Sequence, residues 1–150
     1  MHKNFKIYYF IDKFNREEIE KLDKNISLIF RVYNEKNNVE TIKKIKKLCD
    51  KQKRKLYLSN NLKLAKMLTL NGLYIPSFNR DLSHLSYSYR KNFITIGSAH
   101  NLKEIKNKVT AVLGKNFLQK PSNEWFNNFK IFQKNKDPHE AIKAEIVFLI

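Results

Sequence analysis

Short apolar runs alternate with amphipathic stretches along the first two thirds of the chain. The apolar runs are five to seven residues long, and several are nearly continuous, a pattern typical of strands buried on both faces. They begin near positions 5, 27, 55, 72 and 93. Strands that alternate with helices in this way form right-handed βα units and a parallel sheet. The sequence therefore predicts an α/β fold built from parallel βα repeats.

The stretches between these runs have the features of helices. Asn15 is followed by acidic residues and is expected to begin the first helix, and Asn38 is expected to cap the second. In the second helix the apolar residues recur on one face: Ile42, Ile45, Leu48 and Cys49. We therefore expect Cys49 to lie in the core and not to act as a nucleophile.

A third helix is expected over residues 61–70, with Leu64, Met67 and Leu68 on its apolar face. Leu102 and Ile105 begin another helix after the fifth run. Residues 83–89 are interpreted as a loop or short helix, and residues 109–113 as a sixth strand. A buried strand ending at Ile150 would carry a terminal carboxylate, which favours a chain that is cut short.

The chain is strongly basic, with a formal net charge of +16. Such a charge is typical of proteins that bind nucleic acids. However, only five of the 30 basic residues are arginines, the side chain that best matches phosphates and base edges. The 25 lysines are spread along the whole chain with abundant Asn and Ile, which A/T-rich codons explain. We therefore favour a solvated basic surface over a nucleic-acid site.

The apolar pattern and the cysteine content also indicate where in the cell the protein is expected to lie. No apolar run approaches the ~20 residues of a membrane helix, and the N-terminal residues lack the form of a signal peptide. The one cysteine cannot form an intrachain disulfide. These features predict a cytoplasmic protein that does not enter the membrane.

Five segments at or near the predicted strands form an ordered set. They are YYFID at 8–12, IFR at 29–31, LYLSNNLKLA at 56–65, NGLYI at 71–75 and SAHNLKE at 98–104. In this order they resemble the motifs YLITD, QLR, LIINDRxxLA, DGVHL and SxHSxEE of the thiamine-phosphate synthase family and of its relative, the thiazole tautomerase. The resemblance covers roughly residues 5–105.

This resemblance implies a barrel of the TIM type, with its site at the carboxyl ends of the strands. Such a barrel needs about 200 residues or more, so we expect it to be incomplete or truncated. We interpret residues 1–150 as one domain of this family, with clear βα repeats over 1–108 and a divergent end over 109–150. The family joins a hydroxymethylpyrimidine diphosphate to a thiazole phosphate, using Mg²⁺ on the diphosphate. The tautomerase isomerises a thiazole carboxylate phosphate.

Three candidate site residues stand out by their chemistry. Arg31 is expected inside the apolar strand over 27–33, where its charge needs either an ion pair at the strand end or a substrate phosphate. His100 is the candidate catalytic acid or base, or it is a residue at a helix N-terminus bonded to its own loop. Ser98 is a candidate contact to an anion at that helix N-terminus.

Three further polar residues are candidates for substrate binding, namely Ser59, Asn60 and Asn79, although all three also fit ordinary turns. Asn60 and Asn79 fall where the family holds Mg²⁺ with carboxylates. Amides are weaker ligands for this hard cation, so Mg²⁺ follows from the resemblance but is disfavoured by the residues. The other histidines form no metal-binding pattern with cysteines or acids.

These observations define three classes of function. The first is an enzyme of thiamine biosynthesis that binds a phosphorylated heterocyclic substrate, either a synthase-like transferase or a tautomerase-like isomerase. The second is a non-catalytic binding relative, which a partner subunit or oligomer could complete. The third, least favoured, is a basic nucleic-acid binder.

Overall fold

The computed structural model describes residues 6–31, 38–79, 92–101, 103–105, 107 and 146–149. The chain divides into two compact units, Met1–Tyr74 and Ile75–Ile150. The first unit contains the βα repeats, and the second contains the remaining described strands.

Four parallel strands form the sheet of the first unit, in the order β1-β2-β3-β4. The strands are β1 (Ile7–Ile11), β2 (Ile26–Phe30), β3 (Leu56–Ser59) and β4 (Gly72–Ile75). A helix follows each of the first three: α1 (Arg16–Lys21), α2 (Val39–Lys51) and α3 (Leu62–Met67). The prediction of an α/β fold with parallel βα repeats is therefore confirmed for this unit.

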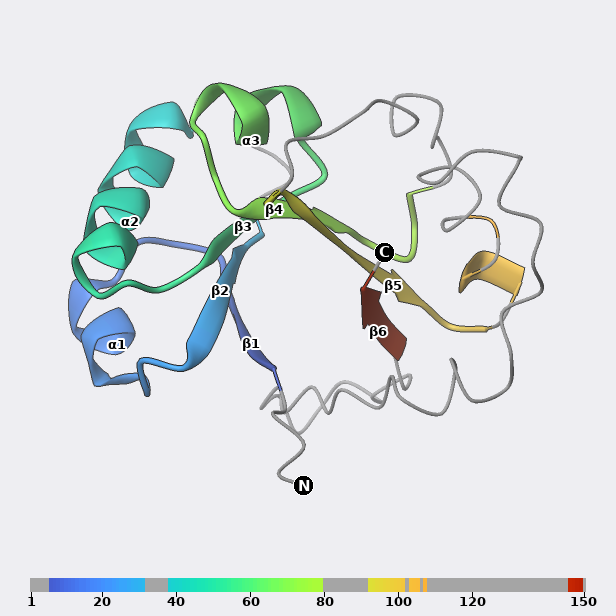
Figure 1. Ribbon diagram of the computed structural model, residues 1–150, viewed down its shortest axis with the longest axis horizontal. Helices are drawn as coiled ribbons and strands as arrows, with labels where there is room; N and C mark the ends of the chain where they lie inside the picture. Colours follow the sequence, from blue (N-terminus) through green and yellow to red (C-terminus); the bar gives the residue numbers. More distant parts are fainter. Residues whose placement is uncertain are drawn as a thin grey trace. The chain divides into compact units, whose positions relative to one another are not determined.

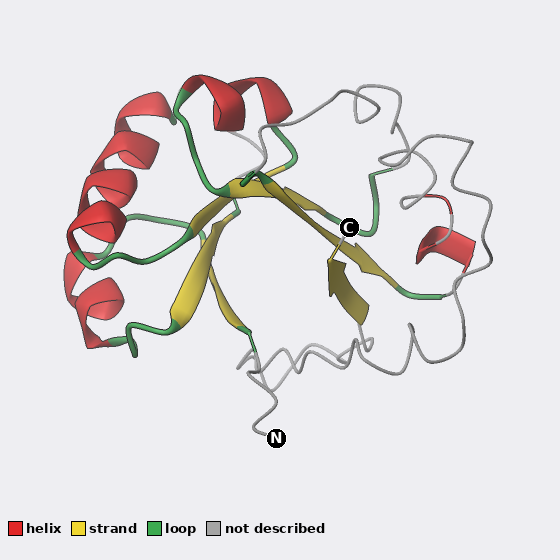
Figure 2. Ribbon diagram, viewed as in Figure 1, coloured by secondary structure: helices red, strands yellow, loops and turns green. Residues whose placement is uncertain are grey.

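All three helices cover the same face of these four strands (Figure 1; Figure 2). Buried apolar residues from the helices meet buried residues of the strands in this layer, and they include Ile19, Leu28, Phe30, Ile42, Ile45, Leu56, Leu58, Ala65 and Leu73. Each of the Ile, Leu and Phe side chains among them contributes about 1.5–3 kcal/mol through removal from water. Cys49 is also buried here, which confirms its predicted place in the core.

The opposite face of the same strands carries a cluster of aromatic rings. Tyr8 and Tyr57 contact each other edge to face, with their ring centroids 5.7 Å apart. Phe10 and Tyr74 do the same at 5.1 Å. Successive side chains of a strand alternate between the two faces, and the strand register places these four rings on one face. We call the face formed by Tyr8, Phe10, Tyr57 and Tyr74 the aromatic face.

The buried side of α3 differs from the prediction. Leu62 and Ala65 are its buried residues, whereas Met67 is 61% exposed. The helix stops at Met67, and Thr69 adopts a left-handed backbone with φ of 51°. The helix is only six residues long and ends at Met67. A spacing of apolar residues that continues to Leu68 extends past this end and does not predict the buried face of the helix. Of the expected face, Leu64 and Leu68 are half-buried, and the expectation was wrong for Met67.

Two element ends also depart from expectation. Strand β2 ends at Phe30, so Arg31 lies just beyond the strand. Asn38 occupies the position before α2, as predicted, but its side chain makes no capping hydrogen bond there. By contrast, the Asn15 side chain accepts a hydrogen bond from the backbone N–H of Glu18, as expected of an N-cap.

In the second unit, β5 (Ile94–Ala99) pairs with β6 (Ile146–Leu149). The two strands are antiparallel, with Ala99 opposite Ile146. A chain of pure βα repeats contains no antiparallel pair, so this strand pair differs from the predicted pattern. Residues 103–105 are helical, and Ile105 is buried, as the expected helix after β5 requires.

The predicted loop over 83–89 and the predicted strand over 109–113 lie outside the described residues. Within the described part of the chain, none of the helices has both the length and the apolar character needed to cross a membrane.

Candidate functional site

The carboxyl ends of β1, β2 and β3 bring three polar residues into line. Ile11 is paired with Phe30, and Phe30 with Leu58. One position further along each strand come Asp12, Arg31 and Ser59. Because parallel strands keep their register, these three residues form the next row across the sheet. Chemistry in parallel βα folds is found at this edge.

Arg31 is the best-defined member of this row. Its Nε donates a hydrogen bond to Oδ1 of Asp12 at 3.1 Å. Its guanidinium carbon lies 5.1 Å from the centroid of the Phe10 ring, in cation–π geometry. The backbone N–H of Arg31 donates to the carbonyl of Ile11 at 2.8 Å. The expected ion pair at the strand end is thus present, and the substrate-phosphate contact stays a prediction.

Ser59 and Asn60 lie at the end of β3 in the same unit. Ser59 is buried and is paired with Tyr74 of β4. Asn60 is exposed, and its backbone N–H donates to the carbonyl of Tyr74 at 2.8 Å. Asn60 has a left-handed backbone with φ of 58°, a conformation that asparagine tolerates better than most residues. This backbone role is the turn function that the sequence offered as the alternative to substrate binding.

Asn79 lies in the second unit, after β4. Its backbone N–H donates to the carbonyl of Pro76 at 3.2 Å, which closes a turn through Ser77 and Phe78. Its side chain is half-buried. The residue therefore takes part in a turn, as the simpler interpretation of the sequence predicted.

Ser98 and His100 lie at the carboxyl end of β5. Ser98 is completely buried inside the strand, opposite Val147. His100 is exposed, one residue after the strand, and its backbone N–H donates to Oε2 of Glu104 at 2.8 Å. The position of His100 at a helix start, bonded to its own loop, matches the simpler of the two interpretations made from the sequence.

A reciprocal hydrogen-bond pattern explains why the chain turns into a helix after His100. The backbone N–H of Glu104 donates to Oδ1 of Asn101 at 3.0 Å. The Glu104 carboxylate in turn accepts from the backbone of His100 and from Nδ2 of Asn101 at 3.3 Å. This arrangement is close to a capping box, and it fixes the backbone of His100 while leaving that residue exposed.

The six predicted site residues thus divide between the two units. Arg31, Ser59 and Asn60 follow neighbouring parallel strands of the first unit. Asn79, Ser98 and His100 belong to the second unit. The prediction that Arg31, Asn60, Asn79 and His100 share one rim stays a prediction.

Two residues of the site were not singled out from the sequence. Asp12 is the ion-pair partner of Arg31, and Phe10 lies under its guanidinium. Both belong to the YYFID segment, which was used as a family motif and gave no role to its individual side chains. The alternation along β1 is the signal that could have found them, since it places Phe10 and Asp12 on one face.

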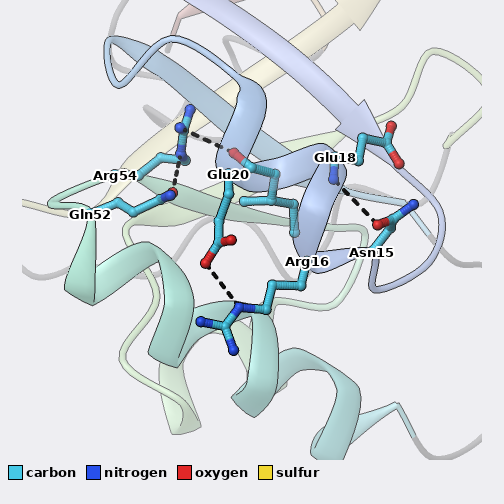
Figure 3. Close-up of polar contacts among 7 residues, drawn as sticks. Asn15, Arg16, Glu18, Glu20, Gln52 and Arg54 are labelled. Atoms are coloured by element: carbon cyan, nitrogen blue, oxygen red, sulfur yellow. Dashed lines mark hydrogen bonds and ion pairs between the residues drawn. The ribbon is translucent and has the colours of Figure 1, made fainter.

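Arg54 is a further arginine whose role the sequence did not reveal. It is buried, and its guanidinium donates to four backbone carbonyls, those of Ile19, Leu22, Asp23 and Ile26. Its Nε also donates to Oε1 of Gln52 at 3.1 Å (Figure 3). The carbonyls include those at the carboxyl end of α1, where a positive charge is favoured by the helix dipole. Arg54 therefore holds α1 and β2 together and is a structural residue.

The aromatic face contains a polar group without a described partner. The hydroxyl of Tyr8 is buried and makes no hydrogen bond within the described part of the chain. Burial raises the pKa of Tyr8 to about 12. The pKa of Tyr57 is also raised, mainly by burial and additionally by the neighbouring Tyr8. Both phenols therefore stay neutral to a higher pH than an exposed tyrosine does.

The residues of the carboxyl edge do not make a good Mg²⁺ site. Asn60, at a metal position of the family, is an amide whose backbone serves a turn. The carboxylate in the same row, Asp12, is engaged by Arg31. Mg²⁺ prefers carboxylate oxygens together with water and substrate phosphate. Among the described residues, no cluster of three or more His, Cys, Asp or Glu side chains is arranged to hold a metal ion.

Comparison of the chain with protein-family models, with curated proteins and with solved structures gives no match.

Proposed function

We propose that this chain is a thiamine-phosphate-synthase-like protein that binds a phosphorylated heterocycle at the carboxyl ends of its parallel strands. The observation that carries the proposal is the row formed by Asp12, Arg31 and Ser59 after β1, β2 and β3. It supplies an arginine at the edge where ligands bind in βα folds. Arginine is the side chain that grips phosphate oxygens in a two-pronged manner.

In this proposal Arg31 binds the phosphate or diphosphate of the substrate. Ser59 and Asn60 contribute polar contacts at the end of β3. His100, which is exposed after β5, is the proposed acid or base. The proposal includes the fold, which would be an incomplete barrel of the TIM type.

The synthase reaction is tested by supplying both family substrates with Mg²⁺. Hydroxymethylpyrimidine diphosphate and thiazole phosphate are incubated with the full chain, and thiamine phosphate is sought by chromatography. Synthase activity predicts product that depends on protein concentration and falls strongly in Arg31→Ala. No product in the presence of Mg²⁺ would remove the transferase function. Mg²⁺ is added because the family resemblance implies it, although the residues at the carboxyl edge are poor ligands for this ion.

A tautomerase-like isomerase is the second candidate, and the amides Asn60 and Asn79 favour it. Isomerisation of a thiazole carboxylate phosphate needs a group that removes and returns a proton, which His100 can supply. It needs no metal-bound diphosphate. Incubation of that substrate with wild type and His100→Ala distinguishes the candidates, because only the isomerase loses turnover while retaining phosphate binding.

A non-catalytic relative is the remaining form of the proposal. It predicts ligand binding through Arg31 without turnover of either substrate. In that case His100→Ala leaves the affinity for the ligand unchanged, whereas Arg31→Ala lowers it.

A further inference from the structure

Three consecutive residues of the β1 end hold Arg31 in place. Ile11 accepts its backbone N–H at 2.8 Å, Asp12 accepts its Nε at 3.1 Å, and Phe10 lies beneath the guanidinium at 5.1 Å. The backbone contact places the residue, the ring contact sets the height of the guanidinium above the sheet, and the carboxylate sets its rotation. All of these contacts come from one neighbouring strand and lie within the first unit.

The Asp12–Arg31 pair is too exposed to be explained by stability. The side chain of Asp12 is 65% exposed and that of Arg31 is 31% exposed. Ion pairs of this kind contribute little to folding, because water screens them and ordering two side chains opposes them. The same contact has a larger effect on binding, since an arginine that is already oriented loses less freedom when a ligand arrives.

The guanidinium nitrogen that Asp12 contacts also determines how a ligand can bind Arg31. The carboxylate bonds to Nε, on the side of the guanidinium nearest the backbone. A phosphate binds arginine in a two-pronged manner through a pair of its nitrogens. Because Asp12 engages Nε, a two-pronged phosphate contact at Arg31 would use the two terminal nitrogens.

We infer that Asp12 is a positioning residue that orients Arg31 for end-on binding of a phosphate or diphosphate group. This inference rests on the proposed function, because it assumes that Arg31 binds the anion. It assigns Asp12 no contact with the ligand. The opposite role is that of an internal competitor, in which Asp12 occupies Arg31 until an anion displaces it. The two roles predict changes of opposite sign when the carboxylate is removed.

Calorimetric titration of the full chain with inorganic pyrophosphate at ~50 mM salt separates these roles, because phosphate contacts are strongest at low salt. Positioning predicts that Asp12→Asn weakens pyrophosphate binding about tenfold, equivalent to about 1.4 kcal/mol. Asp12→Glu keeps the carboxylate and should recover part of the affinity. Asp50→Asn is the matched control, since Asp50 is an exposed acid that pairs with Lys46 on α2 and its removal changes the net charge equally.

A spectroscopic measurement tests the orientation without a ligand. The chain has five arginines, so the Nε–H signal of Arg31 can be assigned by its loss in Arg31→Lys. In the free wild type this proton should exchange slowly with water, since it is bonded to Asp12. In Asp12→Asn it should exchange faster, and in Asp50→Asn it should not change.

The outcomes distinguish failure of this inference from failure of the proposed function. If wild type binds pyrophosphate and Asp12→Asn binds it equally or more tightly, Asp12 does not position Arg31, while the proposed anion site stands. If wild type and Arg31→Ala show the same binding, or neither binds, both the proposed function and the inference are wrong. Weakening in Asp12→Asn together with unchanged binding in Asp50→Asn supports the inference.

Discussion

A terminal nitrogen of Arg54 donates a hydrogen bond of 2.6 Å to the backbone carbonyl of Ile26, the first residue of β2. The same nitrogen also donates to Asp23 at 2.8 Å, and the second terminal nitrogen donates to Leu22 at 3.0 Å. The chain between α1 and β2 thus wraps around one guanidinium. Carbonyls at the carboxyl end of α1 and in the turn after it find a donor there. This explains how a charged side chain can be buried with no acidic partner among the described residues.

Replacement of Arg54 by Met should destabilise the fold strongly. The change removes four hydrogen bonds between a buried guanidinium and backbone carbonyls, and we expect the free energy of unfolding to fall by about 3 kcal/mol or more. Arg54→Lys should recover less than half of the loss, since one ammonium cannot reach carbonyls on both sides of the guanidinium. Urea unfolding followed by circular dichroism measures these values.

Arg16 provides the control for this experiment. It pairs with Glu20 on the exposed side of α1 (Figure 3), and Arg16→Met should change the unfolding free energy by less than about 1 kcal/mol. Equal effects of the two replacements would show that the Arg54 hydrogen bonds do not stabilise the fold.

The neighbouring tyrosines of β1 should respond in opposite ways to loss of their hydroxyls. Tyr8→Phe removes a buried hydroxyl that has no partner in the described part of the chain, and it should leave stability unchanged or raise it by up to about 1 kcal/mol. Tyr9→Phe removes a hydroxyl that donates to Glu18 at 2.7 Å, and it should lower stability by about 0.5–1.5 kcal/mol. A clear loss of stability in Tyr8→Phe would contradict the lack of a partner.

Alkaline pH should destabilise the protein through the same aromatic face. The pKa of Tyr8 is raised from 10.0 to about 12 in the folded state because burial disfavours the phenolate. The unfolded chain therefore releases this proton first, and the stabilising contribution is complete below pH 10 and is lost as the pH rises towards 12. Urea unfolding at pH 9 and pH 11 should show this loss. It should be smaller in Tyr8→Phe, with the remainder coming in part from Tyr57, whose pKa is also raised.

Two asparagines at helix starts allow a matched test of capping. The Asn61 side chain accepts a hydrogen bond from the backbone N–H of Leu64 at 3.0 Å, and Asn61→Ala should lower the unfolding free energy by about 1 kcal/mol. Asn38 precedes α2 without such a bond, so Asn38→Ala should have a smaller effect. The idea fails if Asn38→Ala is the more damaging change.

The sequence predicted the repeats of the first unit because they depend on local patterns. The apolar runs gave β1 to β4, and the spacing of Ile42, Ile45 and Leu48 gave the buried face of α2. The sequence also predicted α3, but the predicted length of that helix and the predicted place of Met67 were wrong, because the chain takes a left-handed turn at Thr69. No local sequence pattern predicts this turn, because threonine does not favour a left-handed backbone.

The site was predictable in part for the same reason. Arg31 was found because a charge beside apolar residues needs a partner, but the partner, Asp12, lies 19 residues earlier in the chain. The carbonyls bound by Arg54 are between 28 and 35 residues away. Such contacts arise from the pairing of β1 with β2 and β2 with β3. Alternation along one strand shows which of its side chains share a face, but it does not show which residues of the neighbouring strand they meet.

Cys49 should be unreactive in the folded protein. It is buried on α2, and burial raises the pKa of its thiol from 9.0 to about 11. Because the thiolate is the reactive form, labelling with a disulfide reagent at pH 8 should be slow in buffer and fast in denaturing urea. The rate in buffer should follow the unfolding equilibrium, so destabilised Arg54→Met should label faster than wild type. Rapid, complete labelling of folded wild type would show that the thiol is accessible and that its assignment to the core is wrong.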